Sequence, residues 1–273
     1  MIKKIIDEFK QLNEVDSVLL GGSRATNNYD DNSDYDFYVY LKKELPESKR
    51  REILEKYASY MEYSNHFWEL EDDGVLNNGI EVEFIYRTID DLDKSLENLC
   101  FKGNVNHGYS TCFLDNLLKS KILFDKGNKI TKLRKKYKDS FSEDLKDRII
   151  LYNFPIINDL MPSLYFQIEK AIKRSDIHSI IHRVSAFFDI FYDVLYAINE
   201  ETHPGEKRLL ELGLKLSKKP KDMKEDIQAV FSNIFLNNEE MLRKLDEISC
   251  KLHMLLVEEG YVIPTNRMIT KQS

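Results

Sequence analysis

The chain has 273 residues, of which 42% are hydrophobic and 32% are charged, the profile of a soluble globular protein with enough apolar mass for two ordinary domains. Its 40 Lys and Arg residues against 47 Asp and Glu residues give a net charge of −7. This charge argues against a general nucleic-acid binder, which needs a basic face for phosphates. The sequence also lacks an apolar run long enough for a membrane span, and its three scattered cysteines favour a reduced, cytoplasmic protein.

The first 90 residues mix helical and strand patterns. Apolar residues at helical spacing predict an opening helix near the N-terminus. The aliphatic run 15–20 stops at two glycines, and 34–41 alternates with period two, so both runs predict strands. Pro46 begins a predicted helix that runs to residue 61. Two more strands are predicted over 66–70 and 80–87, with turns at 72–74 and 77–79.

From residue 90 onward glycine and proline are sparse, and apolar residues recur at spacings of three and four. This pattern predicts a series of helices. The predicted helices cover about 90–100, 106–121, 128–138, 142–173, 176–200, 205–217, 221–236 and 238–259. The sequence therefore predicts a small domain of strands and helices over residues 1–90, followed by a helical domain over residues 91–273.

The segment that carries chemistry begins at the glycine turn, Gly21-Gly22-Ser23-Arg24. Two glycines let the chain turn sharply and bring backbone N–H groups close to an anion. Ser23 adds a hydroxyl donor, and a helix that starts just after it would point its positive end at a phosphate. Arg24 could add positive charge there or could form a structural ion pair. The segment therefore predicts a phosphate-binding turn.

Two carboxylates follow on the second predicted strand. Asp34 and Asp36 are separated by one residue, so both side chains point to the same face. Two anions held that close repel each other unless a cation lies between them, and hard oxygen ligands suit Mg²⁺. A third acid is expected on a neighbouring strand, where Glu81 and Glu83 share one face. Either glutamate could complete the metal site or accept the proton of an acceptor hydroxyl as general base.

The motif Gly22-Ser23 followed by Asp34-Tyr35-Asp36 resembles the nucleotidyltransferase superfamily whose best-known member is DNA polymerase β. More narrowly, it is similar to the aminoglycoside and lincosamide nucleotidyltransferases of antibiotic resistance. The diagnostic residues cover only about residues 1–90, within the size of one small domain. The resemblance implies an α+β fold, in which a small mixed sheet flanked by helices precedes an all-α helical bundle. It also favours Glu83 over Glu81 as the third carboxylate, although glutamate stands where aspartate is commoner.

The resemblance implies a Mg²⁺-dependent enzyme that transfers a nucleotide, AMP from ATP in the leading interpretation, to a hydroxyl of a small molecule with release of pyrophosphate. An aminoglycoside or lincosamide is the leading class of acceptor. The helical domain would build the acceptor pocket, where Asp189, Asp193 and Glu200 could attract a cationic acceptor. The residues implied for metal binding and catalysis are Asp34, Asp36 and Glu83, and those implied for the triphosphate are Gly21, Gly22, Ser23, Arg24 and Lys207.

Two other functions stay open. An enzyme of the same fold could nucleotidylate a protein or RNA, as antitoxin-like transferases do, although minimal antitoxins are usually much shorter. A non-catalytic nucleotide-binding regulator is the second alternative, and the intact carboxylates argue against it. The expected partners are an NTP and a small hydroxyl acceptor, with neither a membrane nor nucleic acid. A homodimer stays among the expectations, because some relatives complete their site across a dimer.

Overall fold

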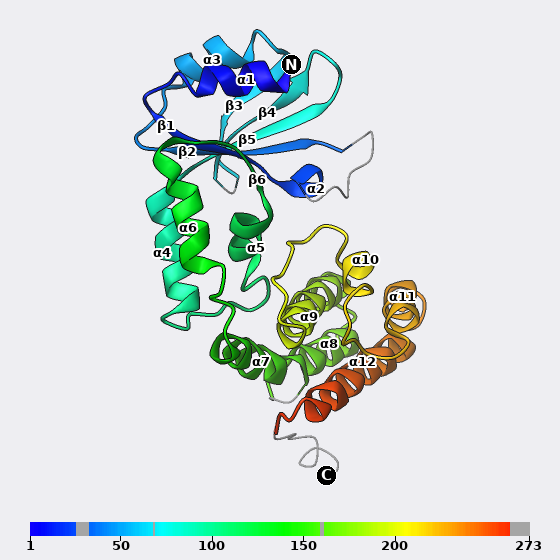
Figure 1. Ribbon diagram of the computed structural model, residues 1–273. Helices are drawn as coiled ribbons and strands as arrows, with labels where there is room; N and C mark the ends of the chain where they lie inside the picture. The colour runs from blue at the N-terminus through cyan, green and yellow to red at the C-terminus, as the bar shows by residue number, and fades with distance from the viewer. Residues whose placement is uncertain (26–32, 68, 159–160, 263–273) are drawn as a thin grey trace. The chain divides into compact units, whose positions relative to one another are not determined.

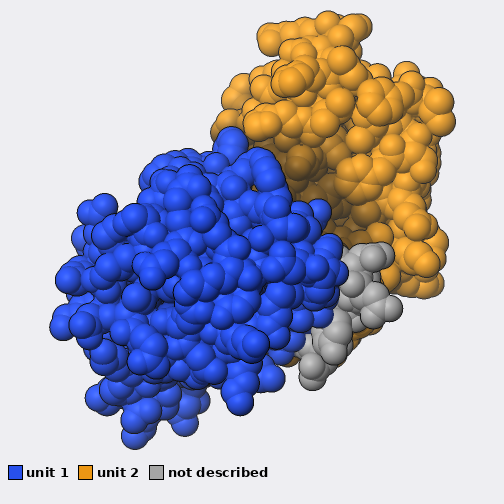
Figure 2. Space-filling view, turned by 90° about the horizontal axis from the view of Figure 1, so that it is seen from above, with its two compact units in different colours: residues 1–98, 113–140 blue, residues 99–112, 141–273 orange. Residues whose placement is uncertain are grey.

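The computed structural model describes residues 1–25, 33–67, 69–158 and 161–262 (Figure 1). The chain forms two compact units (Figure 2). The sheet unit comprises Met1–Asn98 and Phe113–Ser140, and the helical unit comprises Leu99–Cys112 and Phe141–Ser273. The chain therefore passes between the two units three times, because residues 113–140 return to the sheet unit.

The sheet unit is built on a six-stranded sheet of order β3-β4-β5-β2-β1-β6. Strands β2 and β5 run parallel, whereas the other neighbouring strands are antiparallel, so the sheet is mixed as the resemblance implied. The strands are β1 (Val15–Leu20), β2 (Tyr35–Leu41), β3 (Ala58–Asn65), β4 (Leu70–Leu76), β5 (Glu81–Thr88) and β6 (Lys121–Asp125).

One face of this sheet is covered by helices α1 (Ile2–Phe9) and α3 (Glu47–Leu54) (Figure 1). Phe37 of β2 and Phe84 of β5 are fully buried in the core under these helices, with ring centroids 5.1 Å apart. Because side chains alternate along a strand, Asp36 and Glu83 point to the opposite face. The remaining helical elements of this part are α2 (Gly22–Ala25), α4 (Ile89–Cys100), α5 (Cys112–Lys119), the 3₁₀ turn η1 (Lys126–Asn128) and α6 (Lys129–Tyr137).

The helical unit is organised around α9 (Ile177–Ile198), which is buried at every residue from 190 to 198. This burial explains the aromatic run in its sequence, since α7, α8 and α10 all pack against α9. Of the helices that lie in the described part of the chain, none has the length and apolar character to cross a membrane. The other helices of the unit are α7 (Glu143–Asn158), α8 (Leu164–Lys173), α10 (Leu209–Gly213), α11 (Met223–Asn233) and α12 (Asn238–Glu258).

Three predictions for the sheet unit are wrong. Among the described residues of the strand predicted over 66–70, only Leu70 lies in a strand, because β3 ends at Asn65 and β4 begins at Leu70. The helix predicted over 46–61 ends at Leu54, and the chain continues as strand β3. The turn predicted over 72–74 lies in the middle of β4, which pairs with β3 on one side and β5 on the other. An alanine at Gly74 would bring its Cβ to the carbonyl oxygen of Tyr60, so this glycine permits the close approach of β3. Strand pairing here overrides the local turn and helix preferences.

The helical predictions differ from the structure mainly at their ends. The helix predicted over 106–121 begins at Cys112, after a loop in which Gly108 and Tyr109 have positive φ angles of 81° and 55°. Strand β6 follows this helix and was not predicted. The single helix predicted over 142–173 is two helices, α7 and α8, and that predicted over 205–217 is the short α10. The α+β class with its helical second part is confirmed.

Candidate active site

The glycine turn lies directly against the strand that carries Asp36. The Gly21 N–H donates to the Asp36 carbonyl oxygen at 2.8 Å. Gly22 has a φ of +60°, and a Cβ built on it would lie 1.8 Å from Asp36 Oδ2. A Cβ on Gly21 would similarly lie 2.2 Å from the ring of Tyr38. Gly22 is therefore needed both for the close approach to the Asp36 carboxylate and for its left-handed conformation, and Gly21 is needed for the close approach to the Tyr38 ring.

Arg24 of α2 holds the chain just ahead of the aspartate pair. Its Nε donates to the carbonyl oxygens of Ser33 at 2.9 Å and Asp34 at 3.0 Å, and its Nη2 donates to Ser33 at 2.6 Å. The guanidinium also lies 4.2 Å from the centroid of the Tyr35 ring, a cation–π arrangement. Arg24 therefore fixes the backbone of Asp34, which directly precedes β2. Contacts of Arg24 and Ser23 with a triphosphate stay predictions.

The register of the sheet brings acids from three adjacent strands into one line. Asp36 of β2 is paired with Glu83 of β5, and Glu83 is paired with Asp73 of β4. Because paired residues point to the same face, these three carboxyl groups share the face opposite α1 and α3. Asp36 is only 8% exposed, whereas Glu81, two residues before Glu83, is exposed to solvent. This register supports the choice of Glu83 over Glu81.

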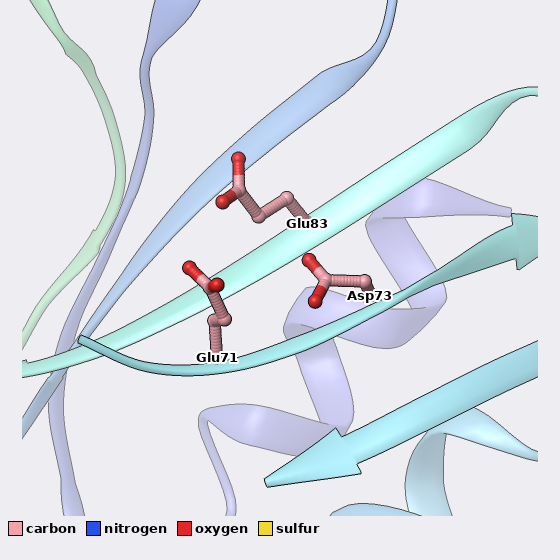
Figure 3. A group of neighbouring side chains, drawn as sticks. All are labelled: Glu71, Asp73 and Glu83. Atoms are coloured by element: carbon pink, nitrogen blue, oxygen red, sulfur yellow. The ribbon is translucent and has the colours of Figure 1, made fainter. Parts of the chain in front are cut away.

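Glu71 joins the line from the same strand as Asp73. Glu71, Asp73 and Glu83 form a carboxylate cluster in which one oxygen from each lies within 4.8 Å of the others (Figure 3). Glu71 is 6% exposed, and Asn65 Nδ2 donates to Asp73 Oδ2 at 2.6 Å. The cluster is thus partly withdrawn from water and held at one edge by the Asn65 amide.

The close spacing of these acids has a clear electrostatic consequence. Burial, together with the negative charges of Asp36, Glu71 and Asp73, raises the pKa of the Glu83 carboxyl from 4.5 to about 8. A carboxyl group keeps its proton at neutral pH when its neighbours are anions and no cation is close. A divalent cation would replace this proton. The donor set of hard carboxylate oxygens is compatible with such a cation, and Mg²⁺ takes this kind of ligand.

Glu71 and Asp73 were not predicted from the sequence, because the run Glu71-Asp72-Asp73-Gly74 was interpreted as a turn. A signal for them was nevertheless present. The real turn is at 77–79, and Asp73 and Glu83 each lie five residues from Asn78. In a tight hairpin, residues equidistant from the turn stand opposite each other. Pairing outward from Asn78 would therefore have placed Asp73 opposite Glu83.

Lys207 lies in the helical unit, where it is exposed and lines a cavity formed by residues of that unit. Its contact with a triphosphate stays a prediction. The three acids that the sequence suggested for a cationic acceptor have different surroundings. Asp193 is buried and accepts hydrogen bonds from Ser110, and Glu200 is paired with Lys146. Asp189 lines the same cavity as Lys207.

We expect the metal-free protein to lose stability as the pH rises toward 8. The folded-state pKa of Glu83 lies above its ordinary value of 4.5, so its contribution is complete below about pH 4.5 and is lost as the pH rises through about 8. Urea unfolding in a chelator between pH 5 and 9 should show this slope, and Glu83→Gln should flatten it. An identical slope in Glu83→Gln would contradict the assignment of the proton to this group.

Comparison with known proteins finds a family model that matches part of the sheet unit. Residues 2–98 match the family model of the nucleotidyltransferase domain. The chain resembles a solved nucleotidyltransferase-like protein from Exiguobacterium sibiricum at 12% identity, over 93% of this chain and 73% of that one, with a TM-score of 0.42. An aminoglycoside 6-adenyltransferase from Bacillus subtilis is matched at 12% identity, over 99% and 95% of the chains, with a TM-score of 0.33.

A third solved structure, a CCA-adding enzyme from Thermotoga maritima in complex with tRNA, is matched at 11% identity and a TM-score of 0.25, over 100% of this chain and 86% of that one. No curated protein matches the chain. The match of the family model begins at α1 and ends within α4, so it includes the glycine turn, Asp34 and Asp36, and the carboxylate cluster. The chain therefore matches a nucleotidyltransferase domain over residues 2–98.

Proposed function

We propose that this chain is a Mg²⁺-dependent enzyme that transfers AMP from ATP to a hydroxyl group of a small molecule and releases pyrophosphate. The observation that carries the proposal is the alignment of Asp36, Glu83 and Asp73 across three adjacent strands, with Gly22 directly against the Asp36 carboxylate. This arrangement combines clustered hard oxygen ligands with a glycine turn of the kind that can bind phosphate.

Asp34, Asp36 and Glu83 would hold the divalent cation, with Asp73 and Glu71 beside them. The cation, when bound, neutralises the charge that develops on the phosphate oxygens during nucleotidyl transfer. Backbone N–H groups of the glycine turn would bind the triphosphate, except that of Gly21, which donates to the Asp36 carbonyl oxygen. Arg24 keeps Asp34 in position through the Asp34 carbonyl oxygen. A carboxylate of the cluster would take the acceptor proton as the acceptor oxygen bonds to the α-phosphorus and pyrophosphate leaves.

For the acceptor we propose an aminoglycoside or lincosamide antibiotic, because the motif spacing resembles the branch that modifies these compounds. We further propose that the enzyme acts in the cytoplasm. Asp34, Asp36 and Glu83 are all present, which favours an enzyme over a non-catalytic nucleotide-binding regulator. A protein or RNA acceptor is the alternative to a small molecule, and the assay below distinguishes the two. Whether the chain forms a homodimer is measured on the same preparation.

The test is pyrophosphate release from each of the four NTPs, with and without Mg²⁺, across aminoglycosides, lincosamides and a control without acceptor. We expect release that needs ATP, Mg²⁺ and one class of acceptor, with the mass of the acceptor raised by that of one adenylyl group, which is AMP less one water. Metal-dependent ATP binding without release on any acceptor would overturn the small-molecule proposal and point to a protein or RNA target. Size-exclusion chromatography with light scattering during the same preparation measures the oligomeric state.

A further inference from the structure

The helical unit contains a cavity of about 1040 Å³ whose walls come from α9, α10 and α11. Its surface is largely apolar and aromatic, with Phe188 and Tyr192 of α9, Leu210 of α10, and Ile227 and Phe231 of α11. The volume is comparable with the upper end of small-molecule sites, roughly 300–1,000 Å³, and such sites combine apolar walls with a few fixed polar groups. The cavity is therefore large enough for a ligand with several rings.

One carboxylate is fixed in this apolar wall. Asp189 of α9 is half-buried, and Tyr109 Oη donates to its Oδ1 at 2.8 Å. Within the described part of the chain, Asp189 forms no ion pair. Burial and the nearby charge of Glu206 raise the pKa of the Asp189 carboxyl group. Glu206 also lines the cavity, as does Lys207, so its charged groups are two acids and one lysine. The cavity thus has apolar walls, and the charged side chains among its lining residues carry a net negative charge.

The position of Asp189 is set by a buried hydrogen-bond network. Ser110 donates to Asp193 through its N–H at 2.9 Å and its Oγ at 2.7 Å, and Asn153 Nδ2 donates to Asp193 at 3.0 Å. Asp193 is only 2% exposed. This network holds the loop that carries Tyr109.

The same loop is pressed onto α9 beside the cavity. A Cβ built on Gly108, which has a φ of +81°, would lie 3.1 Å from Asp189 Cβ. The buried His203 ring packs edge-on against Tyr109, with centroids 4.8 Å apart. Tyr109 therefore holds one oxygen of Asp189 from a rigid loop, which is the preorganisation that binding sites need.

We propose that this cavity binds a small amphipathic cation, with its ammonium group paired to Asp189 and its apolar body packed against Phe188, Tyr192 and Phe231. A charged hydrogen bond to a half-buried carboxylate is stronger than one in water. Burial of an apolar body against aromatic walls adds favourable free energy of binding. A ligand that is polar over its whole surface would instead lose hydrogen bonds to water at these walls. Binding here needs neither the carboxylate cluster nor a nucleotide, so it stands apart from the proposed transferase activity.

The test uses two fluorescent probes with the same apolar body. Dansylcadaverine carries a primary ammonium group, whereas its N-acetyl derivative is neutral. Titrated against the full chain at pH 7 without metal or nucleotide, dansylcadaverine should show saturable, blue-shifted fluorescence. We expect the acetylated probe to bind about tenfold more weakly, since a hydrogen bond to a charged group contributes on that order.

Variants assign the preference to this cavity. Asp189→Asn should remove the preference for the amine, because the asparagine amide oxygen can still accept from Tyr109 but carries no charge. Phe231→Ala should weaken both probes by several-fold; Phe231 is 51% exposed, so this change spares the core. Glu225→Gln, an exposed charge change on the same helix outside the cavity, should alter neither affinity.

Three outcomes would overturn the proposal: no saturable binding of dansylcadaverine, equal affinity of the wild-type chain for the two probes, or an unchanged preference in a folded Asp189→Asn variant. Thermal unfolding verifies that each variant is folded, and the comparison of the two probes on the wild-type chain needs no variant. Asp36→Asn should bind dansylcadaverine normally. Failure at the cavity is therefore distinguishable from failure of nucleotidyl transfer.

Discussion

Replacing Asp36 with asparagine is expected to lower NTP-dependent pyrophosphate release by about a thousandfold, the scale of losing one group that stabilises transition-state charge. Asparagine has nearly the same shape, so the close contact with Gly22 is retained while the negative charge is removed. The same exchange should lower the pKa of Glu83, because the Asp36 charge is one of the causes that raise it. Steady-state pyrophosphate assays and a pH titration of metal-free unfolding measure the two effects.

Glu81→Gln is the matched control for this exchange. It removes the same charge from β5, two residues from Glu83, but at an exposed position. We expect its activity to stay within about twofold of the wild type, since an exposed charge contributes little. Equal losses in Asp36→Asn and Glu81→Gln would show that net charge, rather than the cation site, controls the activity.

The second large effect is expected from Arg50 of α3, one of the two helices that cover one face of the sheet. Arg50 and Asp72 of β4 form a buried ion pair, with side chains 3% and 0% exposed. Tyr86 Oη donates to Asp72 at 2.8 Å, and Arg50 Nη2 donates to Ser64 Oγ at 2.9 Å. Arg50→Ala would leave the Asp72 charge buried without its partner, which costs about 3–5 kcal/mol of unfolding free energy.

Arg51 offers a control one residue away on the same helix. Its side chain is 46% exposed and pairs with Glu47 and Glu55, so Arg51→Ala should cost less than about 1 kcal/mol. Replacing both buried partners, in Arg50→Met with Asp72→Leu, should recover part of the loss because no charge stays buried. Urea denaturation measures all three. Equal destabilisation by Arg50→Ala and Arg51→Ala would contradict the role given to the buried pair.

The Arg50–Asp72 pair also explains why the acids of β4 were difficult to predict. Three consecutive acids before a glycine are typical of a solvated turn. In the folded chain they are divided by the alternation of the strand. Asp72 points toward Arg50 under the helices, whereas Glu71 and Asp73 point toward Glu83 on the other face. The buried position of Asp72 in the strand is favourable because Arg50 of α3, the Tyr86 hydroxyl and the Ser64 N–H all bind its carboxylate.

The features that the sequence determined by itself are local. The glycine turn, the spacing of Asp34 and Asp36, and the alternation of Phe37 with the aspartates depend on neighbours within a few residues. So does the turn at 77–79, which sets the register of β4 against β5. These features indicated the nucleotidyltransferase domain, the α+β class and the helical second part, because short-range backbone geometry and side-chain periodicity already encode them.

The features that only the tertiary structure decided join residues far apart in the chain. Glu83 meets Asp36 because β5 lies beside β2 in the sheet, and residues 58–65 form a strand because β4 offers them an edge. The cavity at Asp189 likewise requires α9, α10, α11 and the loop of Tyr109 to come together. No local spacing specifies such contacts. They are selected by the joint burial of apolar surface and the pairing of buried polar groups, which are properties of the whole fold.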